Sequence, residues 1–275
     1  SFSPFFLSFF SFSSFFFLTY LFVYMQHIKH NLTCASITPV KWHSWDMVKK
    51  EKGQRKEKVE HKGTIEEIID ILLKDLTKFS KHVFVYRWQF KEYKALLTKL
   101  PSLPKTAVAV CDFAENHLCK YQNEVHSAHW GYSQVTVHPC VLFYPCQACE
   151  ELVTDYLVFL SDDLSHDAHM VEVILSQIKH HLQKEAGVEN FIIWSDGCAA
   201  QYKSKLPFYY ISQNPDVQRA YFSSRHGKSP CDSCGGVIKT AVDEDVVGEG
   251  LTIQSAESMY CHLMQHYTLP DPEQL

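Results

Sequence analysis

The order of hydrophobic patterns between residues 106 and 242 limits the fold of this chain more than any other feature. Apolar or alternating segments, typical of strands, come first, and a long amphipathic segment that ends at Gly187 follows them. Strand and helix patterns then alternate to the end of this region. The expected strands are 106–113, 133–144, 151–161, 190–196 and 219–224, with helices at 165–187, after Gly197, and at 229–242.

This order, β-β-β-α-β-α-β-α, is the topology of the RNase H-like fold, an α/β fold built on a mixed sheet. We therefore predict an RNase H-like core over residues 104–245 and a helical tail over residues 246–275. A helical subdomain is expected ahead of the core, over residues 63–101. Within it, Thr64 and Glu67 have the spacing of a capping box, and a second helix at 87–100 stops before a proline.

The first 62 residues are not expected to form a compact domain. Residues 1–18 contain only Ser, Phe, Pro and Leu, whose codons can consist of pyrimidines alone, so we interpret the low-complexity segment 1–24 as a translated pyrimidine tract. The alternative is an apolar membrane anchor, since about 20 uncharged residues can cross a bilayer. Residues 25–62 are expected to be a charged linker, with a basic arm that contacts DNA phosphates as the alternative.

Three acidic residues occupy the positions where an RNase H-like fold gathers carboxylates. Asp112 ends the first strand, Asp196 ends the fourth, and Asp232 lies in the last helix pattern, with 35 residues between it and Asp196. Cleavage or transfer of a phosphodiester needs an activated nucleophile and a stabilised leaving oxyanion, which two cations about 4 Å apart can provide. Mg²⁺ or Mn²⁺ would be held by carboxylate oxygens. The sequence predicts Asp112, Asp196 and Asp232 as catalytic and metal-binding residues.

Each of these acids also has a structural interpretation. Asp112 could end a strand, Asp196 could belong to an Asp-Gly turn, and Asp232 could cap a helix. The third acid is the least fixed by the sequence, because further acids follow it at Asp243, Glu244, Asp245, Glu249 and Glu257.

Basic and polar residues near the acids predict contacts with DNA, although the net charge of −5 gives no general basic footprint. A tyrosine among them could stack on a displaced base, and the cations could offset phosphate charge. The expected nucleic-acid-binding residues are Gln201, Tyr202, Lys203, Lys205, Arg225, His226, Lys228 and Lys239. A solvated helix face is the alternative interpretation.

Several blocks resemble transposon-derived proteins of the DDE/D transposase type found in animal genomes. These blocks are 112–116, 137–139, 161–167, 195–203 and 226–239. The resemblance spans about residues 80–242 and implies an RNase H-like nuclease and strand-transferase core, with the first two acids at Asp112 and Asp196. It also implies DNA and a second copy of the chain as partners, and a nuclear location. A domesticated, non-catalytic DNA- or protein-binding module is the alternative function.

The ten cysteines are too thinly spread for a small secreted disulfide scaffold, and they favour a reducing compartment. Cys146 and Cys149, with Cys231 and Cys234, have the form of two zinc knuckles. However, 81 residues lie between the two pairs, so a zinc ribbon is not expected.

Overall fold

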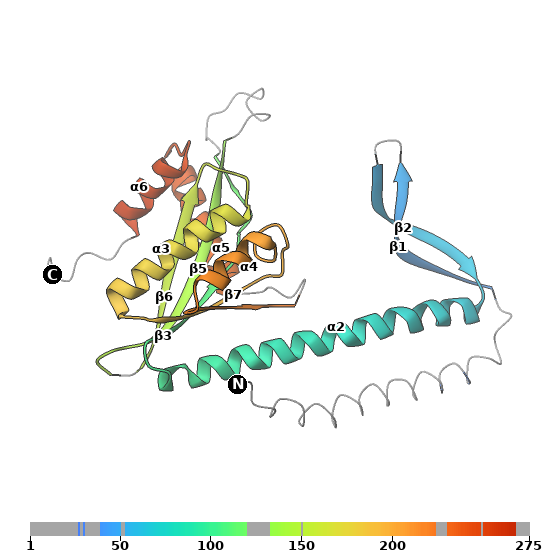
Figure 1. Ribbon diagram of the computed structural model, residues 1–275. Helices are drawn as coiled ribbons and strands as arrows, with labels where there is room; N and C mark the ends of the chain where they lie inside the picture. Colours follow the sequence, from blue (N-terminus) through green and yellow to red (C-terminus); the bar gives the residue numbers. More distant parts are fainter. Residues whose placement is uncertain are drawn as a thin grey trace. The chain divides into compact units, whose positions relative to one another are not determined.

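The structure, a computed structural model, describes residues 27, 30, 39–50, 53–119, 133–149, 151–223, 230–248 and 250–267 (Figure 1). Predictions for residues 1–24 lie outside these ranges. The chain divides into two compact units, 1–87 and 88–275, and the division falls inside helix α2 (Ile65–Lys99). Among the helices in the described ranges, none is both long and apolar enough to cross a bilayer.

Residues 40–50 and 53–63 form a two-stranded ribbon where the sequence analysis expected a linker. Strand β1 (Val40–Lys50) pairs antiparallel with β2 (Gly53–Gly63) along their whole length. The linker prediction is wrong for these residues because Val40, Trp42 and Val48 alternate with charged or exposed side chains, which is the period of a strand.

The helical region ahead of the core is one helix, α2, where two were expected. Its start is the predicted capping box: the Glu67 amide donates to the Thr64 hydroxyl at 3.2 Å, and the Thr64 amide donates to the Glu67 carboxylate at 2.8 Å. No glycine or proline interrupts residues 65–99, so nothing in the sequence breaks the helix between its two apolar stretches. A single 3₁₀ turn, Leu100–Ser102, then closes the helix at Pro101.

The second unit contains the predicted mixed sheet, in the order β6-β5-β3-β7-β8. Strand β5 pairs antiparallel with β3 on one side and with β6 on the other. Strand β7 pairs parallel with β3 on one side and with β8 on the other. The RNase H-like fold is therefore confirmed. A two-residue strand, β4 (His117–Leu118), which was not predicted, adds to the start of β5. The strands are β3 (Thr106–Cys111), β5 (Gln134–Pro145), β6 (Leu152–Ser161), β7 (Asn190–Ser195) and β8 (Val217–Tyr221).

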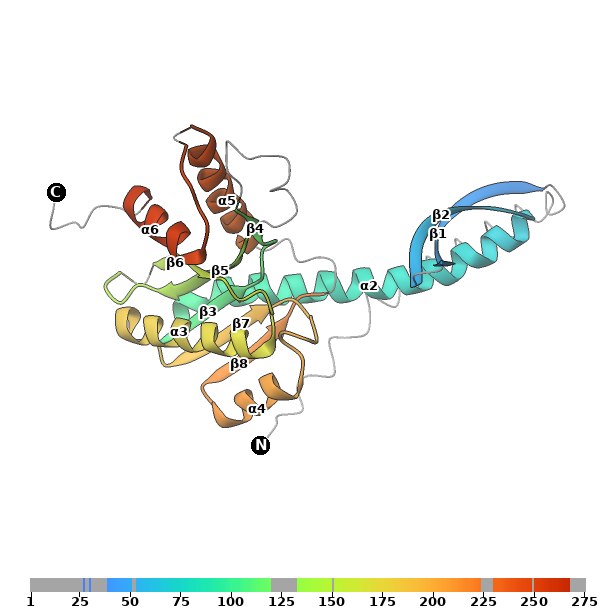
Figure 2. The same cartoon turned by 90° about the horizontal axis from the view of Figure 1, so that it is seen from above.

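Helices cover both faces of the sheet, and successive side chains of β3 point alternately toward one face and the other. Ala107, Ala109 and Cys111 pack with α3 in one cluster, whereas Val108 and Val110 pack with the end of α2 and the start of α5 in another. Figure 2 shows α3 and α4 on one side of the sheet and α5 on the other. These helices are α3 (Ala168–Ala186), α4 (Lys205–Gln213), α5 (Pro230–Gly248) and α6 (Ala256–His266).

Candidate active site

Asp112 and Asp196 occupy equivalent positions on neighbouring parallel strands. The β3–β7 register ends with Cys111 opposite Ser195, so each aspartate is the first residue beyond the paired region. Neighbouring strands lie about 4.8 Å apart. The parallel pairing thus brings two acids that are far apart in the sequence to the same edge of the sheet.

Helix α5 carries Asp232 in its first turn, and two contacts hold the start of this helix against the sheet. The Cys231 thiol, which is buried, donates to the Val110 carbonyl oxygen at 3.1 Å. One turn further on, Gly235 lies so close to the strand-end loop that an added Cβ would be 3.0 Å from the Ala114 Cβ. A thiol and a glycine therefore set how closely this helix approaches β3. The sequence analysis assigned neither role.

The charges of Asp196 and Asp232 act on the carboxyl group of Asp112. The pKa of Asp112 is raised from 3.8 to about 7, first because burial disfavours its charged form and then because Asp196 and Asp232 repel that charge. A hydrogen bond from the Phe113 amide acts in the opposite direction but is the weakest of these causes. The site thus concentrates negative charge that a cation would relieve.

The donor set fits a hard divalent ion in its chemistry, since Asp112, Asp196 and Asp232 offer only carboxylate oxygens. As the side chains stand, no three His, Cys, Asp or Glu residues in the described part of the chain are grouped closely enough to hold a metal ion. Charge repulsion acts over longer distances than coordination. The acids are near enough for repulsion, and a bound cation would have to draw them together.

Asp196 has a turn function as well as its place beside Asp112. Its Oδ1 accepts a hydrogen bond from the Cys198 amide at 3.0 Å, which fixes the tight bend that follows β7. A carboxylate has two oxygens, so the turn interpretation and the site interpretation of Asp196 are compatible.

The acids beyond Asp232 have other surroundings. Asp245 accepts hydrogen bonds from Tyr267 at 2.7 Å and from His262 at 2.8 Å, and these interactions hold its pKa below the usual value. Asp243 is exposed on α5, three turns beyond Asp232. Glu249 lies outside the described residues. Of the α5 acids that the structure describes, Asp232 is the one whose charge raises the pKa of Asp112.

Tyr202 lies in the core, so the prediction that it stacks on a base is wrong. Its side chain is 1% exposed, and its hydroxyl is 3.0 Å from Nε2 of the buried His138. The ring of Phe113 packs edge-on against His138 and stacks on His166 at 4.5 Å. Tyr202 and His138 therefore support the residue that follows Asp112 and do not contact the solvent.

The other predicted DNA contacts differ in accessibility. Lys203 and Lys205 are exposed, and the Lys203 ammonium lies 4.2 Å from the centre of the Tyr221 ring, beside the Gly197 backbone. Gln201 is half-buried, and Lys239 donates to the Glu115 carbonyl oxygen at 3.1 Å. The remaining three predicted contacts, Arg225, His226 and Lys228, lie outside the described residues.

One cysteine pair lies near the middle of β5, and the other follows its C-terminal end. Cys140, in the middle of that strand, is near enough to Cys231 and Cys234 for their charges to affect its pKa, which burial raises well above the usual value. Cys146 follows the end of β5, six residues further on, or about 20 Å along an extended strand. The two pairs are too far apart to bind one zinc ion.

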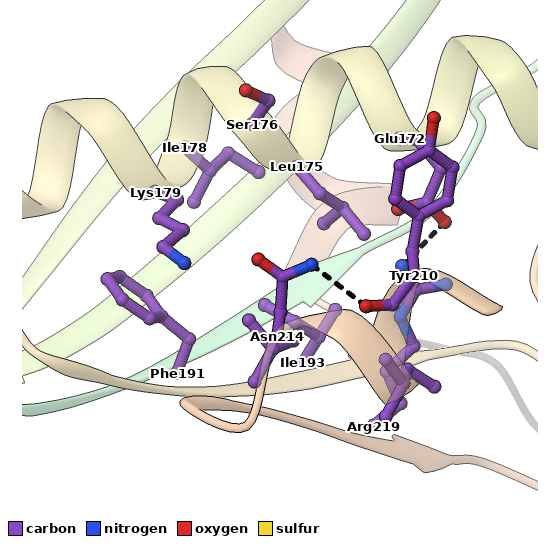
Figure 3. Close-up of a pocket in the computed structure, with 12 residues that line it drawn as sticks. Glu172, Leu175, Ser176, Ile178, Lys179, Phe191, Ile193, Tyr210, Asn214 and Arg219 are labelled. Atoms are coloured by element: carbon purple, nitrogen blue, oxygen red, sulfur yellow. Dashed lines mark hydrogen bonds and ion pairs between the residues drawn. The ribbon is translucent and has the colours of Figure 1, made fainter. Parts of the chain in front are cut away.

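A cavity of about 190 Å³ lies on the side of the sheet that carries α3 and α4 (Figure 3). In its wall, the nearly buried Arg219 guanidinium contacts the Glu172 carboxylate at 2.6 Å. Apolar side chains from α3 and β7, including Leu175, Ile178 and Ile193, form much of the remaining lining. None of the three candidate acids lines this cavity, so it is separate from the acidic edge of the sheet.

The sheet order and the carboxylates at its strand ends define a chain with an RNase H-like core. Residues 89–268 match the family described as "Domain of unknown function (DUF8701)", and the chain belongs to that family. No curated protein matches the sequence.

The solved structures that are similar to this chain include the following three. They are the Mos1 transposase paired-end complex with left transposon end (11% identity, TM-score 0.39, 66% of this chain and 53% of that chain), the Mos1 strand transfer complex (11%, 0.35, 66% and 52%) and the simian T-cell lymphotropic virus intasome in complex with PP2A regulatory subunit B56 gamma (12%, 0.32, 59% and 50%). The present chain spans about half the length of each of these chains.

Proposed function

We propose that the core is a metal-dependent nuclease or strand transferase of the transposase type, which cleaves and joins DNA phosphodiesters. The observation that carries this proposal is the placement of Asp112 and Asp196 at matching ends of parallel strands, with the charge of Asp232 acting on Asp112. Self-association and a nuclear location belong to the same proposal.

In this proposal, Asp112, Asp196 and Asp232 hold two Mg²⁺ or Mn²⁺ ions. The ions would activate the attacking water or 3′-hydroxyl and stabilise the leaving oxygen. The chain itself fixes the positions of the donors, through the β3–β7 pairing and through the bond from Cys231 to Val110. Lys203, beside the turn after Asp196, would offset phosphate charge near the site.

Nicking of supercoiled plasmid DNA by the full chain, with Mg²⁺, Mn²⁺ or EDTA, tests the activity. We expect nicking with a metal and none with EDTA, and Asp112→Asn or Asp196→Asn should lower the rate by more than about 100-fold, since even indirect supports of a metal site cost up to about that much. Asp232→Asn should do the same.

The matched control is Asp243→Asn, which removes one exposed carboxylate from the same helix as Asp232. Its nicking rate should stay near that of the unmodified chain. Nicking that survives Asp112→Asn, or that is lost equally with Asp243→Asn, would contradict the assignment. An absence of nicking with both metals would favour the second candidate, a non-catalytic binding module that keeps the fold.

A further inference from the structure

The pairing register of the β1–β2 ribbon sorts its side chains onto two faces of different character. In an antiparallel pair, directly opposite residues point to the same side, and the side alternates along each strand. One side, here called the lysine face, is the more exposed. It consists of Lys41, His43, Trp45, Met47 and Lys49 of β1 and Gln54, Lys56, Lys58, Glu60 and Lys62 of β2.

Charge is distributed very unequally between the two faces. The lysine face carries five lysines and one acid, Glu60, which pairs with Lys41 at 3.5 Å. On the other face, two cations and two acids balance, and they interact locally: Lys50 contacts Glu57 at 2.6 Å, and Asp46 contacts His61 at 2.7 Å. This local pairing leaves the excess positive charge of the ribbon on one side.

The arrangement on the lysine face is costly for the ribbon alone. Lys41 and Lys62 are directly opposite each other, and like charges in that position are destabilising. An isolated two-stranded ribbon is also only marginally stable in water. A polyanion laid along this face would remove the repulsion and stabilise the ribbon at the same time.

The face has the dimensions and the apolar groups that a nucleic acid requires. Lysines two residues apart, such as Lys56 and Lys58, are about 7 Å apart along the strand, or roughly two base-pair steps. Between the lysines lie Trp45, 65% exposed, and Met47, 60% exposed. A two-stranded ribbon fits the major groove of duplex DNA, where apolar side chains can contact the edges of the bases, such as the thymine methyl group.

We propose that the lysine face of the ribbon binds the phosphate backbone of duplex DNA. The choice of DNA among polyanions rests on the function proposed above, whereas the charge pattern does not depend on it. The ribbon lies outside residues 89–268, which define the family match, so it would add a DNA-holding module to the RNase H-like core.

Binding of the full chain to a fluorescently labelled duplex of arbitrary sequence, measured by anisotropy in EDTA, tests the proposal without cleavage. Salt is varied from about 50 to about 200 mM, since the slope of log affinity against log salt reports the number of phosphates contacted. The test variant is Lys56→Gln/Lys58→Gln. It should make the slope shallower by roughly 1.8, or 0.9 for each lost phosphate contact.

The matched control, Lys50→Gln/Arg55→Gln, removes the same charge from the same ribbon but from the other face. It should leave the slope nearly unchanged, and Lys56→Arg/Lys58→Arg should keep it as well, which separates lost charge from lost folding. Equal effects of the two glutamine pairs, or no effect of Lys56→Gln/Lys58→Gln, would overturn the proposal. So would binding through the same lysines to phosphatidylserine vesicles but not to the duplex.

The same measurement with Asp112→Asn keeps the two proposals separate. If the salt slope depends on Lys56 and Lys58 as expected but neither the unmodified chain nor any variant nicks DNA, the catalytic proposal is removed and the ribbon proposal is retained. If the chain nicks DNA with a metal but Lys56→Gln/Lys58→Gln leaves the salt slope unchanged, the ribbon proposal is removed and the catalytic proposal is retained.

Discussion

The carboxyl group of Asp112 destabilises the fold when it is ionised. Its pKa of about 7 in the folded chain, against 3.8 ordinarily, means that the folded state binds the proton more tightly than the unfolded state does. The penalty is therefore complete above pH 7, shrinks as the pH falls through 7, and is gone near pH 4.

Asp112→Asn should accordingly stabilise the chain at high pH in EDTA. We expect the free energy of unfolding at pH 8 to rise by up to about 4 kcal/mol, since each pKa unit is worth about 1.4 kcal/mol. The gain should disappear at pH 4. Urea unfolding at the two pH values measures it, with the exposed Asp243→Asn as control. A variant that is less stable than the unmodified chain at pH 8 would show that Asp112 has a favourable partner there.

Single residues were predictable where their role follows from the strand on which they lie. Asp112 and Asp196 follow apolar strands, and the ends of adjacent parallel strands meet. Tyr202 follows the same turn as Lys203, but one side chain enters the core and the other is exposed. That difference depends on the distant His138, which no local pattern near Tyr202 reveals.

Substitutions at two adjacent glycines of α5 test whether close packing of this helix against the sheet sets the position of Asp232. A Cβ at Gly235 would be 3.0 Å from the Ala114 Cβ, whereas a Cβ at Gly236 would have nothing within 4 Å. Gly235→Val should cost about 1–3 kcal/mol through overpacking. It should also reduce nicking, because the helix must move away from β3.

Gly236→Val is the control, since it has the same helix context and the same change in composition. Its effect on the free energy of unfolding should be small or favourable, because glycine is a poor helix residue. Thermal unfolding and the plasmid assay compare the pair. Equal behaviour of the two variants would mean that the close approach at Gly235 does not control the helix.

Whole elements of the core were largely predictable, and the ribbon was not. The central strands β3 and β5 are largely apolar and are buried on both faces, so they are recognisable without knowledge of their partners. In β1 and β2, charged residues mask the alternation, and only the pairing reveals that the lysines share one side. The charge of a solvated segment does not distinguish a linker from a strand.

At the scale of the whole molecule, the division into two compact units predicts that the core folds without the β1–β2 ribbon. A chain that begins at Ile65 removes the ribbon and keeps all of α2 and the core. We expect its main unfolding transition to stay within about 2–4 °C of that of the full chain, which corresponds to about 1 kcal/mol for a protein of this size. Differential scanning calorimetry measures this. Loss of the cooperative transition would show that the ribbon contributes to the folding of the core.

The parallel pairing of β3 with β7 also determines when the acidic edge can exist during synthesis. Asp112 and Asp196 are 84 residues apart in the chain, and Asp232 follows 36 residues later. Contacts over such separations form slowly, after local hairpins such as β5–β6. A nascent chain or a fragment that ends before α5 therefore lacks the third acid, and the complete acid set assembles only after nearly the whole core has been made.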